Sequence, residues 1–255
     1  MTEPIEQTAS IQSHGKWADI WAQFRHHKGA SFGGVLLILI VAIVMLGPLF
    51  WHLEANTIDI RARNQGASWA HPLGTDQLGR DTFARLIAGG QTSISVGLTA
   101  MILSLFLGSF IGVLAGFYKR LDGLLMRMTD MFLSLPLLPL LLVMMLLFRD
   151  LLSQSFGPER GMFILIVFAI GITSWMPTAR IVRADVLAIK EREFILAARS
   201  VGLGDAALIL RHILPNVFSP IMVSATLGIA NAIITESALS FLGLGFPPDF
   251  PTWGR

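Results

Sequence analysis

Long apolar runs separated by short polar segments fill most of this 255-residue chain. A transmembrane helix needs roughly 20 mostly apolar residues to cross the hydrocarbon core of a bilayer. Five runs approach or exceed that length, at residues 32–51, 93–117, 124–148, 162–177 and 217–242. The fourth run is the shortest, and extending it toward Ala179 brings it nearer to a full span. The pattern predicts an all-α, polytopic transmembrane helix bundle with five visible spans.

Two prolines and two charges interrupt the third run. Pro136 and Pro139 each remove a helical hydrogen bond, so a kink is expected there. A bent span suits the wall of a pathway, although kinks also occur in passive bundles. Asp130 follows Arg127 by three residues, which favours an ion pair on one helix face near the membrane surface.

Glu236 lies in the fifth run, where a charge is costly and has to face the bundle interior or water. Two roles stay open for it: lining or gating a pathway, and a structural hydrogen bond to a neighbouring helix. In the second run, Gly108, Gly112 and Gly116 recur every four residues, so another helix can pack closely along that face. That helix can belong to this chain or to a second subunit.

A polar stretch, residues 193–215, separates the last two runs and is called here the docking segment. Its first half has one apolar helix face, made of Phe194, Ala197, Ala198 and Val201. Gly202 and Gly204 then break the helix, and Asp205 is positioned to cap the next one. The same spacing returns in Ala206, Ile209, Leu210 and Ile213 before Pro215 ends it. The pattern predicts two short amphipathic helices hinged on glycine.

The docking segment resembles the cytoplasmic coupling loop of binding-protein-dependent ABC importer permeases. Their pattern is E-A-A, a glycine four positions later, and a terminal L-P. Five positions match it: Ala197, Ala198, Gly202, Leu214 and Pro215. Leu196 stands where the family has its glutamate, so a salt bridge from that glutamate is not carried over. The resemblance implies contacts to an ATPase from Glu193, Phe194, Ala197, Ala198, Arg199, Val201, Gly202, Gly204, Asp205, Leu214 and Pro215.

A second string, H-P-L-G-T-D-Q-L-G-R-D at residues 71–81, is called here the outer motif. It resembles the dipeptide, oligopeptide and nickel branch of these permeases, and the subunit with one long outer loop after its first span. Gly74 and Gly79 permit tight turns. Thr75 can cap a short helix starting near Asp76, and local pairing is open to Asp76, Arg80 and Asp81. The motif either folds only against the outer mouth or also receives a binding protein.

The string after the fifth run, residues 240–255, resembles the loop that precedes the last span of these permeases. The family usually has six spans, so we expect the sixth to be missing from this chain. Residues 31–255 are expected to form one permease domain, with the coupling loop at about residues 180–216. Residues 1–30 are expected to be a cytoplasmic tail with an interfacial helix, because Trp17, Ile20, Trp21 and Phe24 share one face.

Composition supports the membrane assignment, and charge indicates its orientation. Only 14% of residues are charged, against about 25% in soluble domains. With the N-terminus inside, the inner segments carry twelve Lys and Arg residues and the outer ones six. This excess favours a cytoplasmic N-terminus. The net charge of +2 therefore reflects topology and gives no support to a nucleic-acid partner.

The motifs of several enzyme classes are missing from the sequence. It has no G-x-x-x-x-G-K-[ST] motif, so we expect a non-catalytic subunit whose partners bind ATP and Mg²⁺. Its six histidines are scattered and no nucleophile–base pair stands out, so neither a metal nor a cofactor is expected in this chain. It has no cysteine.

The resemblance implies a transmembrane subunit of an ATP-driven importer in the bacterial cytoplasmic membrane. Its expected partners are a homologous permease, two ATPase subunits, an extracytoplasmic solute-binding protein and membrane lipid. The cargo can be dipeptides, oligopeptides, nickel complexes or other small solutes. Two other functional classes stay open. An ion-coupled secondary transporter would need paired ionisable residues at mid-membrane, where Glu236 is the one candidate. A non-transporting scaffold would need no glycine hinge.

Overall fold

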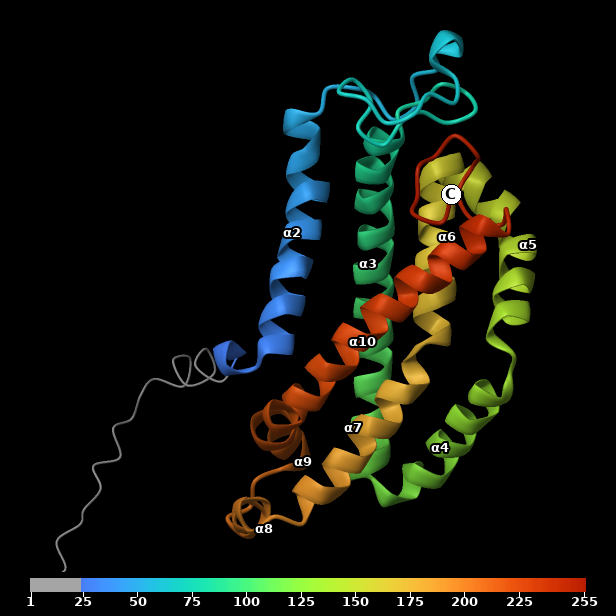
Figure 1. Ribbon diagram of the computed structural model, residues 1–255. Helices are drawn as coiled ribbons and strands as arrows, with labels where there is room; N and C mark the ends of the chain where they lie inside the picture. Colours follow the sequence, from blue (N-terminus) through green and yellow to red (C-terminus); the bar gives the residue numbers. More distant parts are fainter. Residues whose placement is uncertain (1–23) are drawn as a thin grey trace, which may run out of the picture. The chain divides into compact units, whose positions relative to one another are not determined.

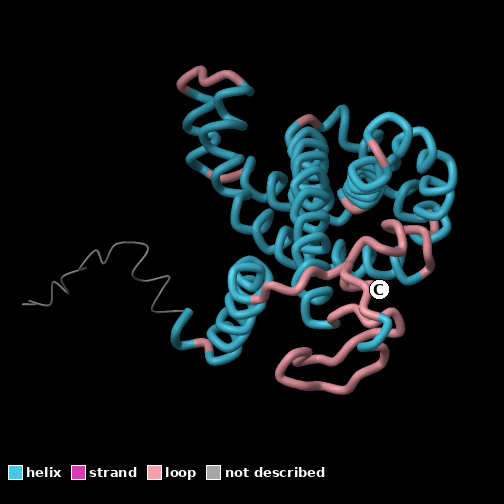
Figure 2. The backbone as a smooth tube through the Cα atoms, turned by 90° about the horizontal axis from the view of Figure 1, so that it is seen from above, coloured by secondary structure: helices cyan, strands magenta, loops and turns pink. Residues whose placement is uncertain are grey.

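A computed structural model describes residues 24–255, and this part of the chain forms helices joined by loops, with no strand (Figure 2). The elements are α2 (Lys28–Phe50), η1 (Ile60–Ala62), α3 (Thr82–Phe117), α4 (Lys119–Ser134), α5 (Leu137–Phe156), α6 (Pro158–Thr173), α7 (Trp175–Lys190), α8 (Glu193–Ser200), α9 (Asp205–Leu208), the π-helix η2 (Ile209–Ile213) and α10 (Leu214–Phe241).

Within residues 24–255, five helical stretches are long and apolar enough to cross a membrane, which agrees with the predicted number of spans. They are Lys28–Phe50, Thr82–Phe117, Leu137–Phe156, Pro158–Lys190 and Asp205–Phe241. The fourth is longer than the predicted run because the chain passes a short break at Ser174 and continues as α7. The extension toward Ala179 is therefore confirmed.

The chain divides into two compact units, Met1–Phe50 and Trp51–Arg255, which are described separately. In the first unit, α2 is apolar around its whole circumference, as expected for a helix surrounded by lipid. The predicted interfacial helix is not tested, because Trp17, Ile20 and Trp21 lie outside the described residues.

Helix α3 is the central element of the second unit, and it packs against α6, α7 and α10. Figure 1 shows α10 crossing α3 obliquely. The closest packing is with α7, along the predicted glycine face. A Cβ atom at Gly112 would lie 2.7 Å from the Ala179 carbonyl oxygen, and one at Gly116 would lie 2.7 Å from Cβ of Val186. The glycines therefore serve packing within this chain.

The third predicted run is not one span. It divides into α4 and α5 at Leu135 and Pro136, so the expected kink is a complete break. Leu135 and Pro136 are both extended, in agreement with the restriction that a proline places on the residue before it. The membrane-crossing part of this region is therefore α5, and α4 is a separate amphipathic helix with Lys119, Arg120 and Asp122 in its first turn.

Two large apolar clusters, with a smaller one around Trp175, give the second unit its core. One joins α3, α5, α6 and α10 and includes Val96, Leu141, Ile166 and Leu239, all fully buried. The other joins α3 and α7 to the docking segment, through residues such as Val113, Val182 and Ile195. The docking segment is thus built into the hydrophobic core of the bundle.

Candidate functional site

The docking segment folds as two short helices with a glycine turn between them, as predicted (Figure 1). α8 ends at Ser200, and Gly202 has a φ of +87°, a left-handed conformation that favours glycine. The Gly202 N–H donates to the Arg199 carbonyl at 3.0 Å, and the Leu203 N–H donates to the Ala198 carbonyl at 3.2 Å. These bonds satisfy carbonyls at the end of α8 and fix the reversal of the chain.

One face of α8 is attached to the bundle. Ile195 is fully buried in the cluster that also holds Val182 of α7 and Val217 of α10. Ala198 packs against the same cluster, and the Arg199 guanidinium lies over the Phe117 ring at 5.8 Å from its centroid. A displacement of α8 therefore acts directly on α3, α7 and α10.

The other face of α8 is apolar and exposed. Phe194 and Leu196 are 45% and 47% exposed, and Val201 is 88% exposed. Ala197 is exposed between them. The predicted apolar face is thus present, except that Ala198 turns partly into the core. Leu196, in the place of the family's glutamate, is also exposed.

The start of the second helix differs from the prediction. Gly204, rather than Asp205, is the N-cap residue of α9, and no side chain caps it. Asp205 lies in the first turn, where its negative charge still interacts favourably with the positive end of the helix dipole.

The predicted apolar face of the second helix is half right, because Ile209 and Ile213 pack in the apolar cluster and Ala206 and Leu210 do not. Leu208 and Ile213 are fully buried, whereas Ala206 is exposed and Leu210 is 64% exposed. The reason is the π-helix at Ile209–Ile213, which widens the turn and shifts the side chains around the axis.

Pro215 does not end the helix. Beyond the π-helix, the Leu214 N–H donates to the Ile209 carbonyl five residues earlier. Pro215 follows in the first turn of α10, so α9, η2 and α10 form one continuous helical stretch. A proline has no N–H, and its ring would clash with the carbonyl four residues before it in a regular α-helix. The wider π-turn relieves this conflict, and Pro215 joins the docking segment rigidly to the fifth span.

At the other end of the bundle, the outer motif folds as a network of turns. Gly74 and Gly79 have φ angles of +74° and +79°, which confirms the two predicted turns. A Cβ atom at Gly79 would lie 1.7 Å from the Asp59 carbonyl oxygen, so only glycine fits there. Asp76 pairs with Arg80 as predicted, with Nε–Oδ2 at 2.7 Å.

Thr75 and Asp81 have roles that differ from the predicted ones. Thr75 caps no helix: its hydroxyl donates to the Ala62 carbonyl and accepts from the Gln65 N–H, which ties the motif to the preceding loop. Asp81 accepts from the Ala84 N–H at 2.6 Å and thereby caps α3. Its second carboxylate oxygen lies 2.7 Å from Nδ1 of His71.

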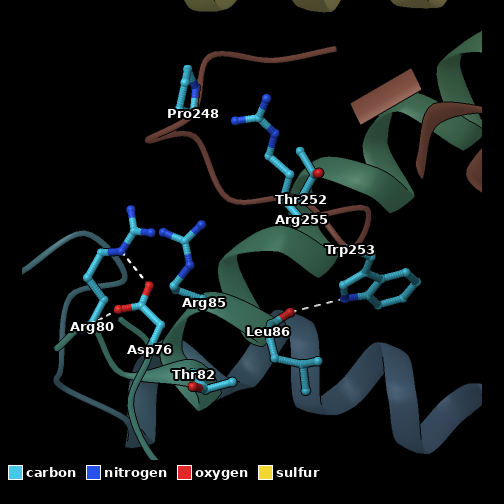
Figure 3. A pocket seen from close by; sticks show the side chains of 9 residues that line it. All are labelled: Asp76, Arg80, Thr82, Arg85, Leu86, Pro248, Thr252, Trp253 and Arg255. Carbon is cyan, nitrogen blue, oxygen red and sulfur yellow. Dashed lines mark hydrogen bonds and ion pairs between the residues drawn. The ribbon is translucent and has the colours of Figure 1, made fainter. Parts of the chain in front are cut away.

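A pocket of about 650 Å³ lies beside the outer motif, and Figure 3 shows the residues that line it. Arg80, Arg85 and Arg255 line it together with Asp76, and Trp253 donates to the Leu86 carbonyl at 3.1 Å. Burial raises the pKa of the Asp76 carboxyl, but hydrogen bonds from Arg80 and Leu78 outweigh it and lower the pKa below its ordinary value. Asp76 thus stays ionised and holds Arg80 in place.

Comparison with known proteins identifies the chain. A family model described as "Binding-protein-dependent transport system inner membrane component" matches residues 104–255, and one described as "N-terminal TM domain of oligopeptide transport permease C" matches residues 15–67. This chain belongs to the binding-protein-dependent permease family. It is a transmembrane, non-catalytic subunit of an ABC importer, in which the ATPase is a separate subunit.

Relatives of this permease cover nearly its whole length. A putative peptide permease protein of Brucella suis is 38% identical over 244 residues, which are 95% of this chain and 77% of the relative. The oligopeptide transport system permease protein OppC of Bacillus subtilis is 35% identical over 246 residues, 96% of this chain and 77% of that protein. These matches favour neither a secondary transporter nor a scaffold.

Glu236 of the permease is fully buried between helices. It accepts hydrogen bonds from the hydroxyls of Ser93 in α3 and Ser240 in α10, each at 2.7 Å. Ser93 in turn accepts from the Trp253 N–H at 3.2 Å. This geometry is that of the structural alternative, a hydrogen bond to a neighbouring helix, and the pathway role stays a prediction.

The ion pairs of α4 are formed with α7 and were missed by the sequence reasoning. Asp130 pairs with Arg180, not with Arg127, so the predicted local pair is wrong. Asp122 pairs with Arg183. The hydrogen bonds from Arg183 lower the pKa of the Asp122 carboxyl, against the opposing effect of its burial. The partners are far apart in sequence, so the spacing of residues along one helix could not have predicted these pairs.

Proposed function

We propose that this permease forms half of the membrane path of a bacterial peptide importer. A second, homologous permease completes the path, two ATPase subunits bind ATP and Mg²⁺ on the cytoplasmic side, and an extracytoplasmic binding protein delivers the cargo. The relatives named as peptide and oligopeptide transport permeases support a peptide cargo. The excess of Lys and Arg in the segments that include the docking segment supports a cytoplasmic N-terminus in the cytoplasmic membrane.

The observation that carries this proposal is the division of α8 into two faces. One face is fixed in the core of the bundle by Ile195, and the other presents Phe194, Ala197 and Val201 to the surroundings. A small apolar face on an exposed helix fits into a groove of a soluble partner. Beside it lies a hollow of about 660 Å³ lined by Ile189, Glu191, Arg192, Glu193, Phe194 and Asn216, which offers charged groups around the apolar contact.

The proposed mechanism is mechanical. When the ATPase subunits close on ATP, they displace α8, and α8 cannot move without the cluster that contains Ile195. The displacement reaches α7 through that cluster and reaches α10 through the continuous helical stretch at Pro215. A change in the angle between these helices switches the side from which the path is open.

The test is a charge placed on the exposed face of α8. Ala197→Arg leaves the buried face untouched, and an unpaired charge in an apolar interface is strongly unfavourable. We expect the variant to insert normally and to lose both ATPase co-purification and ATP-dependent peptide uptake. Ala70→Arg, the same change at an exposed alanine in the loop before the outer motif, should retain both. Normal co-purification and uptake by Ala197→Arg would contradict the proposal.

The orientation is tested separately. Because the chain has no cysteine, Val201→Cys introduces a unique thiol at a position that is 88% exposed. In inside-out vesicles that contain the permease without its ATPase subunits, a membrane-impermeant thiol reagent should label it, and in intact spheroplasts the reagent should leave it unlabelled. Labelling from the external side would show that the docking segment faces away from any cytoplasmic ATPase.

A further inference from the structure

A groove of about 520 Å³ lies where the break between α4 and α5 meets the break between α6 and α7. Its walls come from the junction of α4 and α5, from the junction of α6 and α7, and from the middle of α10. None of its lining residues is Asp, Glu, Lys or Arg. Most of them are apolar, such as Leu133, Leu137, Ile181 and Leu227, and a few hydroxyl and amide side chains lie among these.

The two breaks share one chemical feature. Pro139 and Pro177 are each the third residue of the helix that follows the break. Pro177 has no N–H, so the Thr173 carbonyl, four residues earlier, loses its usual helical donor. Leu135 is extended and lies between α4 and α5, so its carbonyl has no helical donor either. Leu135 and Thr173 both line the groove. At membrane depth such backbone is stable only inside protein or along a cavity that supplies hydrogen-bonding partners.

The third wall contributes an amide. Asn231 lines the groove from α10 and is exposed, and its side chain makes no hydrogen bond to any residue in the described part of the chain. A carboxamide in a membrane span is costly unless it meets a partner or water. It offers one carbonyl acceptor and an NH₂ donor, the same pair of groups that a peptide bond offers.

We propose that this groove binds the backbone of the passing peptide, with Asn231 pairing with a peptide bond and the carbonyls of Leu135 and Thr173 accepting peptide N–H groups. This inference rests on the proposed function, because it takes the cargo to be a peptide. The rest of the wall carries no charge, so it offers no ion pair with which to select a charged side chain of the peptide. Recognition through the backbone therefore lets one path admit peptides of different sequence.

The chemistry of the groove argues against the other kinds of cargo. A metal ion or an anionic solute would find no charged side chain among the lining residues to compensate its own charge. An aliphatic occupant, such as a lipid chain, would leave the Asn231 amide unpaired. A peptide backbone satisfies both donor and acceptor groups at once.

The first experiment compares substitutions on α10 in the complete importer, reconstituted in proteoliposomes with its ATPase subunits and binding protein. Asn231→Leu keeps a similar volume and removes the amide. We expect peptide uptake to fall about fivefold to thirtyfold, the factor that one or two hydrogen bonds supply. Thr235→Val should cause a smaller loss because Thr235 lines the groove, and its hydroxyl is already bonded to the Asn231 carbonyl at 2.8 Å.

Thr226→Val is the matched control. Thr226 is in the same helix, its hydroxyl bonds to the Val223 carbonyl at 2.9 Å in a similar way, and it does not line the groove. Uptake by this variant should equal that of the unmodified complex. Equal uptake by Asn231→Leu and Thr226→Val, with equal amounts of assembled complex, would overturn the proposal.

The second experiment tests whether the groove recognises the backbone of the transported peptide. A depsipeptide, in which an ester replaces one amide, lacks a single N–H donor. After correction for its affinity to the binding protein, the unmodified importer should transport it more slowly than the matching peptide, and Asn231→Leu should reduce that difference. Equal discrimination by both forms would show that Asn231 does not recognise the peptide bond and would overturn the inference.

A single cysteine in the groove distinguishes a bound peptide from a helix of the homologous permease. During turnover, saturating peptide should slow the labelling of Asn231→Cys by a small thiol reagent. If the thiol instead cross-links to the homologous permease in every state, a helix of that subunit fills the groove and the inference fails. Failure of the proposed function looks different: the unmodified complex would then show no ATP-dependent uptake of any peptide.

Discussion

Arg183 of α7 donates hydrogen bonds through both Nε and Nη2 to the carboxylate of Asp122 in α4, sixty-one residues earlier in the chain. The Nη2–Oδ2 distance is 2.7 Å, and both side chains are partly buried. This bidentate pair fixes the position of α4, the short helix that leads into the break at Pro136. It therefore links α7, which continues toward the docking segment, to one wall of the central groove.

Loss of this pair should loosen α4. Asp122→Asn keeps the shape of the side chain but removes its charge, and we expect the purified complex to melt a few degrees lower, as for a loss of about 1 kcal/mol. Asp130→Asn is the internal comparison, because its pair with Arg180 is more exposed, at 59% and 52%. A smaller shift is expected there, since water screens exposed pairs more strongly. An equal or larger effect of Asp130→Asn would contradict this ranking.

The role of Glu236 can be decided by two substitutions. If it is structural, Glu236→Gln should keep transport, because an amide can still bond to the hydroxyls of Ser93 and Ser240. Glu236→Leu should then lower the stability of the complex by about 1–3 kcal/mol, since it leaves buried hydroxyls without partners. The measurements are thermal unfolding in detergent and uptake in vesicles. A Glu236→Gln variant of normal stability and without uptake would instead assign the carboxylate to the pathway.

Substitution of glycine by alanine should have opposite effects on stability at Gly112 of α3 and at Gly123 of α4. A Cβ atom at Gly112 would lie 2.8 Å from Cβ of Val182, so Gly112→Ala should force α3 and α7 apart at a cost of about 1–3 kcal/mol. Gly123 in α4 has no atom within 4 Å of its would-be Cβ. There the same change should stabilise the helix by about 0.5–1 kcal/mol. Thermal unfolding of the two variants checks both signs, and a destabilised Gly123→Ala would show that α4 packs more tightly than described.

Local patterns along the chain were sufficient to predict the number of spans and the two-part docking segment. Length and hydropathy determine a span, and the glycine pair at Gly202 and Gly204 signals a hinge in any helical context. The face formed by Phe194, Ala197 and Val201 could also be predicted, because one regular α-helical repeat covers it. These features depend on neighbours within about two helical turns.

The predictions failed where distant partners or irregular turns decide the geometry. Asp130 had a cation three residues away in sequence, yet Arg180 lies closer in the folded bundle. In the second half of the docking segment, two of the four residues of the predicted apolar face are exposed, because a π-turn at Ile209–Ile213 changes the helical period. The hydroxyls around Glu236 come from residues 143 positions before it and 4 positions after it, a combination that periodicity does not reveal.

The turn between α8 and α9 offers a test in which strain alone is changed. Gly202 has a φ of +87°, Gly204 has a φ of −70°, and neither has any atom within 4 Å of a would-be Cβ. Serine at residue 202 must therefore adopt a left-handed conformation, which costs about 1–2 kcal/mol, without any new clash. Serine at residue 204 has an ordinary backbone conformation at the N-cap of α9, a position that serine favours.

We therefore expect Gly202→Ser to lower ATP-dependent uptake several-fold, because the reversal that seats α8 against the bundle is strained. Gly204→Ser should leave uptake unchanged or slightly raise the stability of the complex. Both variants keep the length and the apolar face of the segment. Comparison of uptake with ATPase activity in the same vesicles therefore measures the effect of the glycine turn on coupling. If the two substitutions lower uptake equally, the segment needs flexibility at both positions, and the left-handed turn at Gly202 has no special part in coupling.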